Sequence, residues 1–519
     1  MRPGRPRVLF RARSRLPDTA LQGAAIVSSR VTIQQGDLEG LLEGGVHKFL
    51  GVPYALPPVG DLRWRAPQPF PEWRGLREAK AFGPACPQTT GAVFGMRVLE
   101  QSEDCLYLNV WTRTLDATAR QPVMVWIHGG GNLGGSGCER PTDGSNLSKL
   151  GVTVVSFNYR LGAFGFLAHP DSGANFGLQD QIAVLRWVRA NITTFGGDPD
   201  RVTIFGQSAG AQAVRTLLRS HSTAGLIHRA ILQSAGFEPF AFGTPLTYAR
   251  ARAIAEELFS RLGGGTPERL RAAPTEAVKV ASHELCGVLP IPGRLRTPAD
   301  LAWMPVEDND TLLAQDGLGA MDRVPILMGF TRNEARYFLK PGVPFNQGVL
   351  EGMCRLFGGA QSNALLAELA AQGGSVYEKI DRVFTTAIWA EPALATVRRL
   401  APLNPNLYVY RFDRVSPELA QTAELAKHTA EIRYIFGTLP PTPDYDATDT
   451  RISNFFQEAW INFARTGTPG SPGKVSWPSY VAASHRALVI DEPFALYPLS
   501  DDPLIRLMQT GRTQFTNPG

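Results

Sequence analysis

The chain has 519 residues, of which 44% are hydrophobic and 19% charged, a balance that is typical of a protein with a large core and that excludes general disorder. The net charge of +5 is small for this length and the arginines are scattered, so nothing indicates nucleic-acid binding. No apolar run approaches the ~20 residues of a membrane-spanning helix, and the length fits one large α/β domain with insertions.

The first thirty residues are predicted to be a flexible N-terminal tail. They are rich in arginine and poor in acidic residues, and they lack the apolar segment of a secretory signal peptide. A wrongly assigned start and the remnant of a targeting segment are the alternatives. The folded domain is predicted to span residues 31–513, and the sequence fits either a monomer or a homodimer.

Five cysteines leave at least one thiol without a partner inside the chain. Cys86 and Cys105 bracket 18 residues and could be joined by a disulfide, whereas Cys138, Cys286 and Cys354 have no assigned role. A disulfide would favour export to an oxidising compartment, while the missing signal peptide favours the cytoplasm. No CxxC pair or His/Cys cluster indicates a metal site, so we expect neither a metal nor another cofactor.

The first predicted elements alternate in strand fashion from residue 31, with glycines at the turns. Four prolines between Pro53 and Pro67 then forbid a regular helix or a central strand. We interpret this stretch as an ordered crossing segment anchored by Tyr54, Trp64 and Trp73.

Strands and helices alternate through the rest of the chain, which predicts a mainly parallel sheet covered on both faces. Two mostly helical stretches, about 244–302 and 341–400, are expected to be insertions over the carboxyl edge of the sheet, where such folds bind ligands. Helices are predicted at 178–190 and 211–218. The predicted strands are 106–110, 123–127, 152–156, 202–205, 230–233, 324–329, 407–412 and 487–490.

The chain around Ser208 reads as a strand, the sequence GQSAG and a helix, without a break. That order is typical of a nucleophile elbow, a sharp turn that exposes the serine hydroxyl at the edge of the sheet. The flanking Gly206 and Gly210 would leave room for neighbouring backbone. A structural turn rich in glycine and serine is the alternative interpretation.

A serine nucleophile needs a base, and the base needs an acid that orients it. In folds with this elbow the acid and then the base follow the serine along the chain. His428 follows the strand at 407–412, where a loop can return over Ser208, and it is the predicted base. A surface or core histidine is the alternative. Position argues against the other histidines after the nucleophile: His221, His228, His283 and His485.

The predicted acid is Glu334, the single carboxylate in the loop after the strand at 324–329. Its alternative role is that of a carboxylate in the first turn of a helix. The glycines of HGGGN at 128–132 follow a buried strand and let backbone amides approach a substrate oxygen. The amides of Gly130, Gly131 and Ala209 are the predicted oxyanion hole. A phosphate-binding loop fits this glycine run less well, because no Lys-Ser/Thr pair follows it and no helix begins there.

Over residues 31–498 the chain resembles the type-B carboxylesterase family, and in character it is most similar to the bacterial carboxylesterases. The resemblance implies an α/β-hydrolase fold, and the same nucleophile, acid, base and oxyanion donors. The motifs that match are FLGVPYALPPVGDLRWRAP, SEDCLYLNVW, HGGG, FNYRLGAFGFL, NFGLQDQIAVLRWVRANITTFGGDPDRVTIFGQSAG and WINFARTGTP.

The resemblance also implies a Cys86–Cys105 disulfide and a hydrogen bond from Ser234 near the acid. Tyr337 and Phe338 resemble aromatic residues that line the substrate pocket.

Some positions depart from the family pattern. Gln207, which is predicted to line the substrate pocket, stands where many members carry Glu, and Asn132 replaces a common aromatic residue. Asn333 and Ala335 flank the acid where Asp and Gly are usual. The stretch 87–104 contains no tryptophan, so a quaternary-ammonium substrate is not expected.

Together these patterns predict a serine carboxylesterase that hydrolyses a small-molecule ester through an acyl-enzyme. A detoxifying esterase, an amidase or a lipase is the alternative on the same site, and a non-catalytic binding protein is the alternative on the same fold. Arg332 and Arg336 beside the acid either face an anionic substrate or pair with structural carboxylates.

Overall fold

The computed structural model describes residues 27–89, 100–238, 246–286, 302–308, 318–339, 345–481 and 484–516. The predicted tail therefore lies almost entirely outside the described residues, as do parts of both predicted insertions. No helix within the described ranges is long and apolar enough to cross a membrane.

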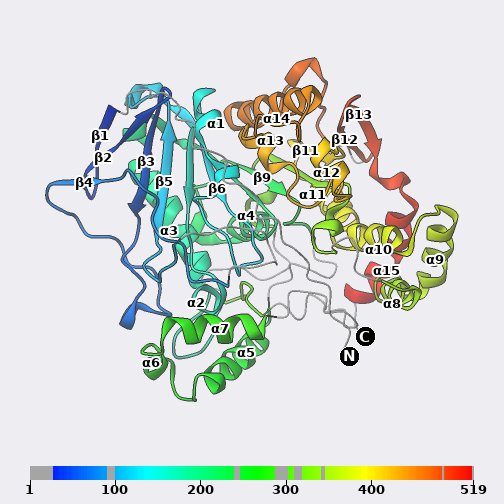
Figure 1. Ribbon diagram of the computed structural model, residues 1–519, viewed down its shortest axis with the longest axis horizontal. Coiled ribbons are helices and arrows are strands. Elements are labelled where there is room, and N and C mark those ends of the chain that lie inside the picture. The colour runs from blue at the N-terminus through cyan, green and yellow to red at the C-terminus, as the bar shows by residue number, and fades with distance from the viewer. Residues whose placement is uncertain are drawn as a thin grey trace, which may run out of the picture.

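A 13-stranded sheet forms the centre of the molecule (Figure 1). Its strands are β1 (Val27–Ile33), β2 (Gly36–Glu43), β3 (Val46–Pro53), β4 (Leu76–Glu78), β5 (Tyr107–Thr112), β6 (Gln121–Ile127), β7 (Thr153–Phe157), β8 (Gly197–Gln207), β9 (Arg229–Gln233), β10 (Ile326–Thr331), β11 (Leu407–Phe412), β12 (Arg486–Ile490) and β13 (Ala495–Pro498).

The strand order is β1-β2-β3-β5-β7-β6-β8-β9-β10-β11-β12-β13, with β4 paired to β2. All neighbours from β7 to β12 run parallel. Apart from the parallel β2–β4 pair, the margins are antiparallel, from β1 to the β5–β7 pair on one side and at the β12–β13 pair on the other. The predicted, mainly parallel sheet is thus confirmed, and short hairpins extend it at both ends.

Helices cover both faces of this sheet (Figure 1). The main ones are α1 (Ser145–Lys149), α2 (Gly162–Phe166), α3 (Phe176–Asn191), α4 (Ala209–Arg219), α5 (Tyr248–Arg261), α6 (Pro267–Leu270), α7 (Thr275–Leu285), α8 (Gln347–Gly358), α9 (Ser362–Ala371), α10 (Val376–Thr385), α11 (Glu391–Leu400), α12 (Pro417–Gln421), α13 (Ile432–Phe436), α14 (Ala447–Thr466) and α15 (Pro503–Thr516).

Side chains of the central strands alternate between two apolar cores, because successive residues of a strand point to opposite faces. In β6, Val123, Val125 and Ile127 join the core that includes α3 and α4. Met124 and Trp126 join the other core, which includes α14. The continuous apolar run of this strand therefore reflects burial on both faces.

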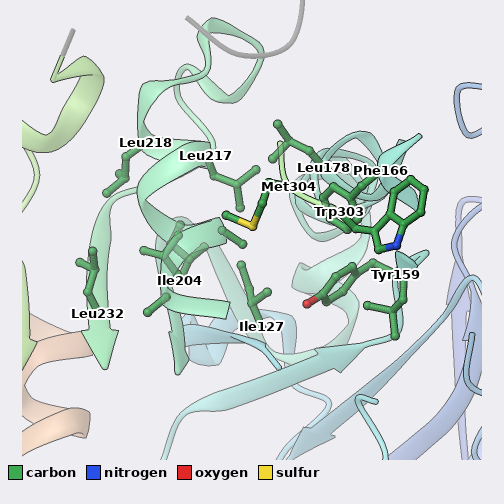
Figure 2. Packing of buried hydrophobic residues seen from close by; sticks show 14 of the residues in the cluster. Ile127, Tyr159, Phe166, Leu178, Ile204, Leu217, Leu218, Leu232, Trp303 and Met304 are labelled. Carbon is green, nitrogen blue, oxygen red and sulfur yellow. The ribbon is translucent and has the colours of Figure 1, made fainter. Parts of the chain in front are cut away.

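Helix α4 packs on β8 and β9, and so fixes the start of the helix relative to the strand ends. Figure 2 shows Ile127 and Ile204 of the sheet beside Leu217 of α4. All three side chains are buried, and each contributes about 2 kcal/mol of hydrophobic stabilisation. This packing gives the site a rigid base.

The two mostly helical stretches form separate groups. Helices α5, α6 and α7 lie beside α2, while α8, α9 and α10 lie beside α15 (Figure 1). These groups lie in the two stretches that the sequence predicts to be helical insertions.

The predicted disulfide between Cys86 and Cys105 is wrong: both side chains are buried free thiols. The Cys86 sulfur accepts a hydrogen bond from the Leu161 amide at 3.2 Å. A hydrogen bond to Cys86, together with burial, raises the pKa of the Cys105 thiol. The spacing thus brings the two sulfurs together, but hydrogen bonds satisfy them and no covalent bond joins them.

Candidate active site

Ser208 occupies the single position between the end of β8 and the start of α4. Its backbone has φ 58° and ψ −127°, a conformation that costs a residue with a side chain roughly 1–3 kcal/mol. The amide of Ser208 donates to the Gln233 carbonyl of the neighbouring strand at 2.8 Å, which holds the turn in place. Ser208 is partly exposed, although the end of β8 before it is buried.

The two glycines of the elbow have no room for a side chain. A Cβ atom on Gly206 would lie 2.5 Å from the carbonyl carbon of Gly210. A Cβ atom on Gly210 would lie 2.0 Å from the Ile127 carbonyl oxygen at the end of β6. Because both obstacles are backbone atoms, the tight turn requires glycine at both positions.

The predicted acid and base meet in the structure, although 94 residues separate them. Glu334 begins the 3₁₀ turn η8 (Glu334–Tyr337) just beyond β10, and its Oε1 accepts from the Thr331 amide at 2.7 Å. Its Oε2 lies 2.5 Å from Nδ1 of His428, and the two residues are only 0% and 2% exposed. Since a carboxylate accepts, Nδ1 carries the proton and Nε2 is left as the acceptor.

The hydrogen-bond partner of Nε2 is not the one that the sequence predicts. The side-chain amide nitrogen of Gln207 lies 3.0 Å from Nε2 of His428. Among the described residues, this carboxamide and not the Ser208 hydroxyl is bonded to Nε2 of His428. Sequence reasoning placed Gln207 in the substrate pocket but did not find this contact.

The glycine loop after β6 lies directly against Ser208. A Cβ atom on Gly129 would be 3.1 Å from Cβ of Ser208. Gly130 and Gly131 have φ values of 107° and 63°, which glycine adopts without strain. Within the described part of the chain, the amides of these two glycines and of Ala209 donate to no protein group. Such amides, one of them at a helix N-terminus, can stabilise negative charge.

His128 opens this loop but is not arranged as a base. Its ring stacks on Tyr159 at a centroid distance of 4.4 Å, and its Nδ1 lies 2.9 Å from the Gly129 carbonyl oxygen. Burial lowers the pKa of His128 to about 4, so the ring is neutral near pH 7.

Three aromatic rings surround His428. The ring centroids of Tyr337, Phe338 and Trp389 lie 5.7, 5.2 and 5.6 Å from that of the imidazole. Tyr337 and Phe338, two of the residues predicted to line the pocket, therefore lie beside His428. Trp389 was not predicted, because it lies in a π-helical turn, η10 (Thr386–Ala390), within a stretch whose sequence indicates only helix.

The hydroxyl of Ser234 does not make the hydrogen bond that the family resemblance implies. Its Oγ is buried and has no protein partner among the described residues. The backbone of Ser234 is fixed instead, since its carbonyl accepts from the Trp389 indole at 2.7 Å and its amide donates to the Gly329 carbonyl at 2.7 Å. Ser234 thus helps to place the tryptophan.

A second carboxyl group, Glu431, lies buried near the acid. Burial and the charge of Glu334 raise its pKa to about 8. Its Oε1 accepts a long hydrogen bond, 3.4 Å, from the Gln233 side chain. Near pH 7 this arrangement favours the protonated form of Glu431.

Both arginines beside the acid form ion pairs within the protein. Arg336 lies 2.8 Å from the buried carboxylate of Asp381, and Arg332 lies 3.5 Å from Asp413. These contacts favour structural pairing over contact with an anionic substrate. In the described ranges no group of three or more His, Cys, Asp or Glu side chains is arranged to hold a metal ion.

The fold and the site agree with the comparisons with known proteins. The chain matches the carboxylesterase family over residues 27–353 and 356–502. It is 34% identical to the para-nitrobenzyl esterase of Bacillus subtilis (strain 168) over 487 residues, which cover 90% of this chain and 95% of the relative. It is 36% identical to the phenmedipham hydrolase of Pseudarthrobacter oxydans over 482 residues, 88% of this chain and 94% of that one. A solved structure named PNB esterase superposes with a TM-score of 0.79 at 32% identity, covering 92% of this chain and 99% of the other.

The sheet, the elbow and these matches define an α/β-hydrolase fold and a carboxylic-ester hydrolase. The chain belongs to the carboxylesterase family, as its motifs predict.

Proposed function

We propose that the enzyme hydrolyses carboxylic esters through an acyl-enzyme on Ser208, with His428 as the general base and Glu334 as the acid that orients it. The observation that carries this proposal is the buried hydrogen bond of 2.5 Å between Glu334 and His428 next to the elbow. It fixes the tautomer in which Nε2 is able to accept a proton.

In the acylation step, His428 takes the proton of Ser208 as the serine oxygen attacks the ester carbonyl. The carbonyl oxygen becomes negatively charged and is held by the amides of Gly130, Gly131 and Ala209. Each such donor lowers the barrier by roughly 3 kcal/mol. His428 then donates its proton to the departing alcohol, and the same histidine activates the water that releases the acid.

The test is Ser208→Ala, measured with p-nitrophenyl butyrate and with the unfolding midpoint. We expect kcat to fall by at least about 10⁴-fold, because no other group can form the acyl-enzyme, while the midpoint is nearly unchanged. Ser471→Ala, a change at an exposed serine, is the control and should keep full activity. Substantial turnover by pure Ser208→Ala protein would contradict the assignment.

We propose small, uncharged esters as the substrate class. The neutral carboxamide of Gln207 and the rings of Tyr337, Phe338 and Trp389 present no carboxylate to a cationic alcohol. The values of kcat/KM for esters of increasing acyl and alcohol length would separate an esterase from a lipase, and those for the matched amides would separate it from an amidase.

A further inference from the structure

The carboxamide of Gln207 lies on the reactive nitrogen of the base. Gln207 is the last residue of β8, is 2% exposed, and has its amide nitrogen 3.0 Å from Nε2 of His428. Because Nδ1–H is bonded to Glu334, Nε2 presents a lone pair, and the group that fits there is an N–H donor. A carbonyl oxygen in the same place would find no proton to accept.

The surrounding backbone leaves the carboxamide little freedom. The main chain of Gln207 is paired with Gln233 across β8 and β9. A Cβ atom on Gly129 would lie 3.2 Å from the side-chain oxygen of Gln207, so the glycine loop packs against the other end of the amide. The carboxamide is thus held between the oxyanion loop and the imidazole.

We propose that Gln207 is a positioning residue that caps Nε2 of His428 in the substrate-free enzyme and releases it when Ser208 is deprotonated. This inference rests on the proposed function, since the lone pair of Nε2 is the one that accepts the serine proton. One lone pair accepts one strong hydrogen bond, so the amide of Gln207 and the hydroxyl of Ser208 compete for it.

The charge at this position also affects the base. Glu334 faces the imidazole from η8, Glu431 lies beside Glu334, and Glu139 acts on the Tyr337 ring that packs against His428. Three further groups add little net charge: Glu424 and Lys427 form an ion pair, and His128 is uncharged near pH 7. An amide donor at position 207 stabilises the neutral imidazole, whereas a carboxylate there would stabilise the imidazolium.

Two substitutions test the cap. Gln207→Met keeps the length of the side chain and removes the donor, and Gln207→Glu replaces the donor with a carboxylate. The readouts are the kcat/KM of p-nitrophenyl butyrate as a function of pH, and the rate at which diethyl p-nitrophenyl phosphate labels Ser208.

For Gln207→Met we expect labelling at high pH to be about 2- to 10-fold faster, since one neutral hydrogen bond no longer competes. The midpoint of the acid limb should move upward by up to about one pH unit in this variant. It should move further in Gln207→Glu, because the carboxylate stabilises the protonated ring.

Slower labelling in Gln207→Met with an unchanged acid limb would overturn the cap and leave Gln207 as a structural residue. If Gln207→Met does not fold, Gln207→Leu removes the donor in the same way and is judged by the same two readouts. A wild-type protein that is neither active nor labelled at Ser208 would instead refute the proposed function. A labelled, active wild type with unaltered variants would refute the cap alone.

Discussion

Glu431 is a buried residue near the acid whose ionisation affects the stability of the fold. Its pKa is raised from 4.5 to about 8 in the folded protein, whereas an unfolded chain leaves it near its ordinary value. Between about pH 5 and pH 8 the folded state therefore binds a proton that the unfolded state has lost. The linkage relation then makes this contribution to stability fall as pH rises, by up to about 1.4 kcal/mol per pH unit.

Glu431→Gln should remove this dependence. We expect the free energy of unfolding of the wild type, minus that of the variant, to decrease steadily from about pH 5 to about pH 8. Urea unfolding at a series of pH values measures it. Glu72→Gln, a change at an exposed glutamate, should give a flat difference. A flat difference for Glu431→Gln as well would show that Glu431 is ionised in the folded protein at neutral pH.

The local rules of the sequence lead to the elbow and to the Glu334–His428 pair, but not to the contacts around them. The GQSAG motif after an apolar run predicts the elbow, and the order of elements leads to Glu334 and His428. The contact of Gln207 with the base depends on side-chain rotation across 221 residues, which no spacing encodes. The free thiol of Cys86 likewise depends on an amide donor, Leu161, from a distant segment.

At the level of elements, the elbow depends on how closely β6 and the start of α4 approach. Gly210→Ala would place a methyl group 2.0 Å from the Ile127 carbonyl oxygen. We expect a loss of about 2–4 kcal/mol in unfolding free energy and a fall in kcat, because the strand that leads into the oxyanion loop must move.

Gly352→Ala is the matched control for this change. Gly352 lies within α8, and a Cβ atom there would meet nothing within 4 Å. Because alanine favours a helix over glycine, this variant should gain up to about 1 kcal/mol and keep its activity. Equal stability of the two variants would contradict the close approach at the elbow.

The sequence predicts the central elements well because each strand from β6 to β12 contains a short apolar run buried on both faces. It does not predict the π-helical turn that contains Trp389. A π turn differs from an α-helix by one inserted residue, and the apolar pattern of 376–400 is compatible with either.

For the molecule as a whole, the C-terminal helix α15 is an anchor for the second helical group. Arg512 of α15 forms an ion pair of 2.5 Å with Glu391, with the two side chains 15% and 0% exposed. Glu391 begins α11 directly after the turn that presents Trp389 to His428. The ion pair therefore connects α15 to the segment that places Trp389 beside His428.

Arg512→Met should cost about 3 kcal/mol of stability, because it leaves the buried carboxylate of Glu391 without this partner. Arg355→Ala, which breaks an exposed pair with Glu351 on α8, should cost no more than about 0.5 kcal/mol. Thermal and urea unfolding measure the loss of stability in each variant relative to the wild type. Similar losses would show that α15 does not stabilise this part of the fold.

The central claim is that a covalent intermediate forms on Ser208, and the most direct measurement is peptide mass mapping after reaction with diethyl p-nitrophenyl phosphate. We predict one phosphoryl group per chain, on the peptide that contains Ser208, appearing in step with the loss of esterase activity and absent from Ser208→Ala. A protein that keeps hydrolysing esters after Ser208 is fully labelled, or that loses activity through a label on another residue, would contradict the account.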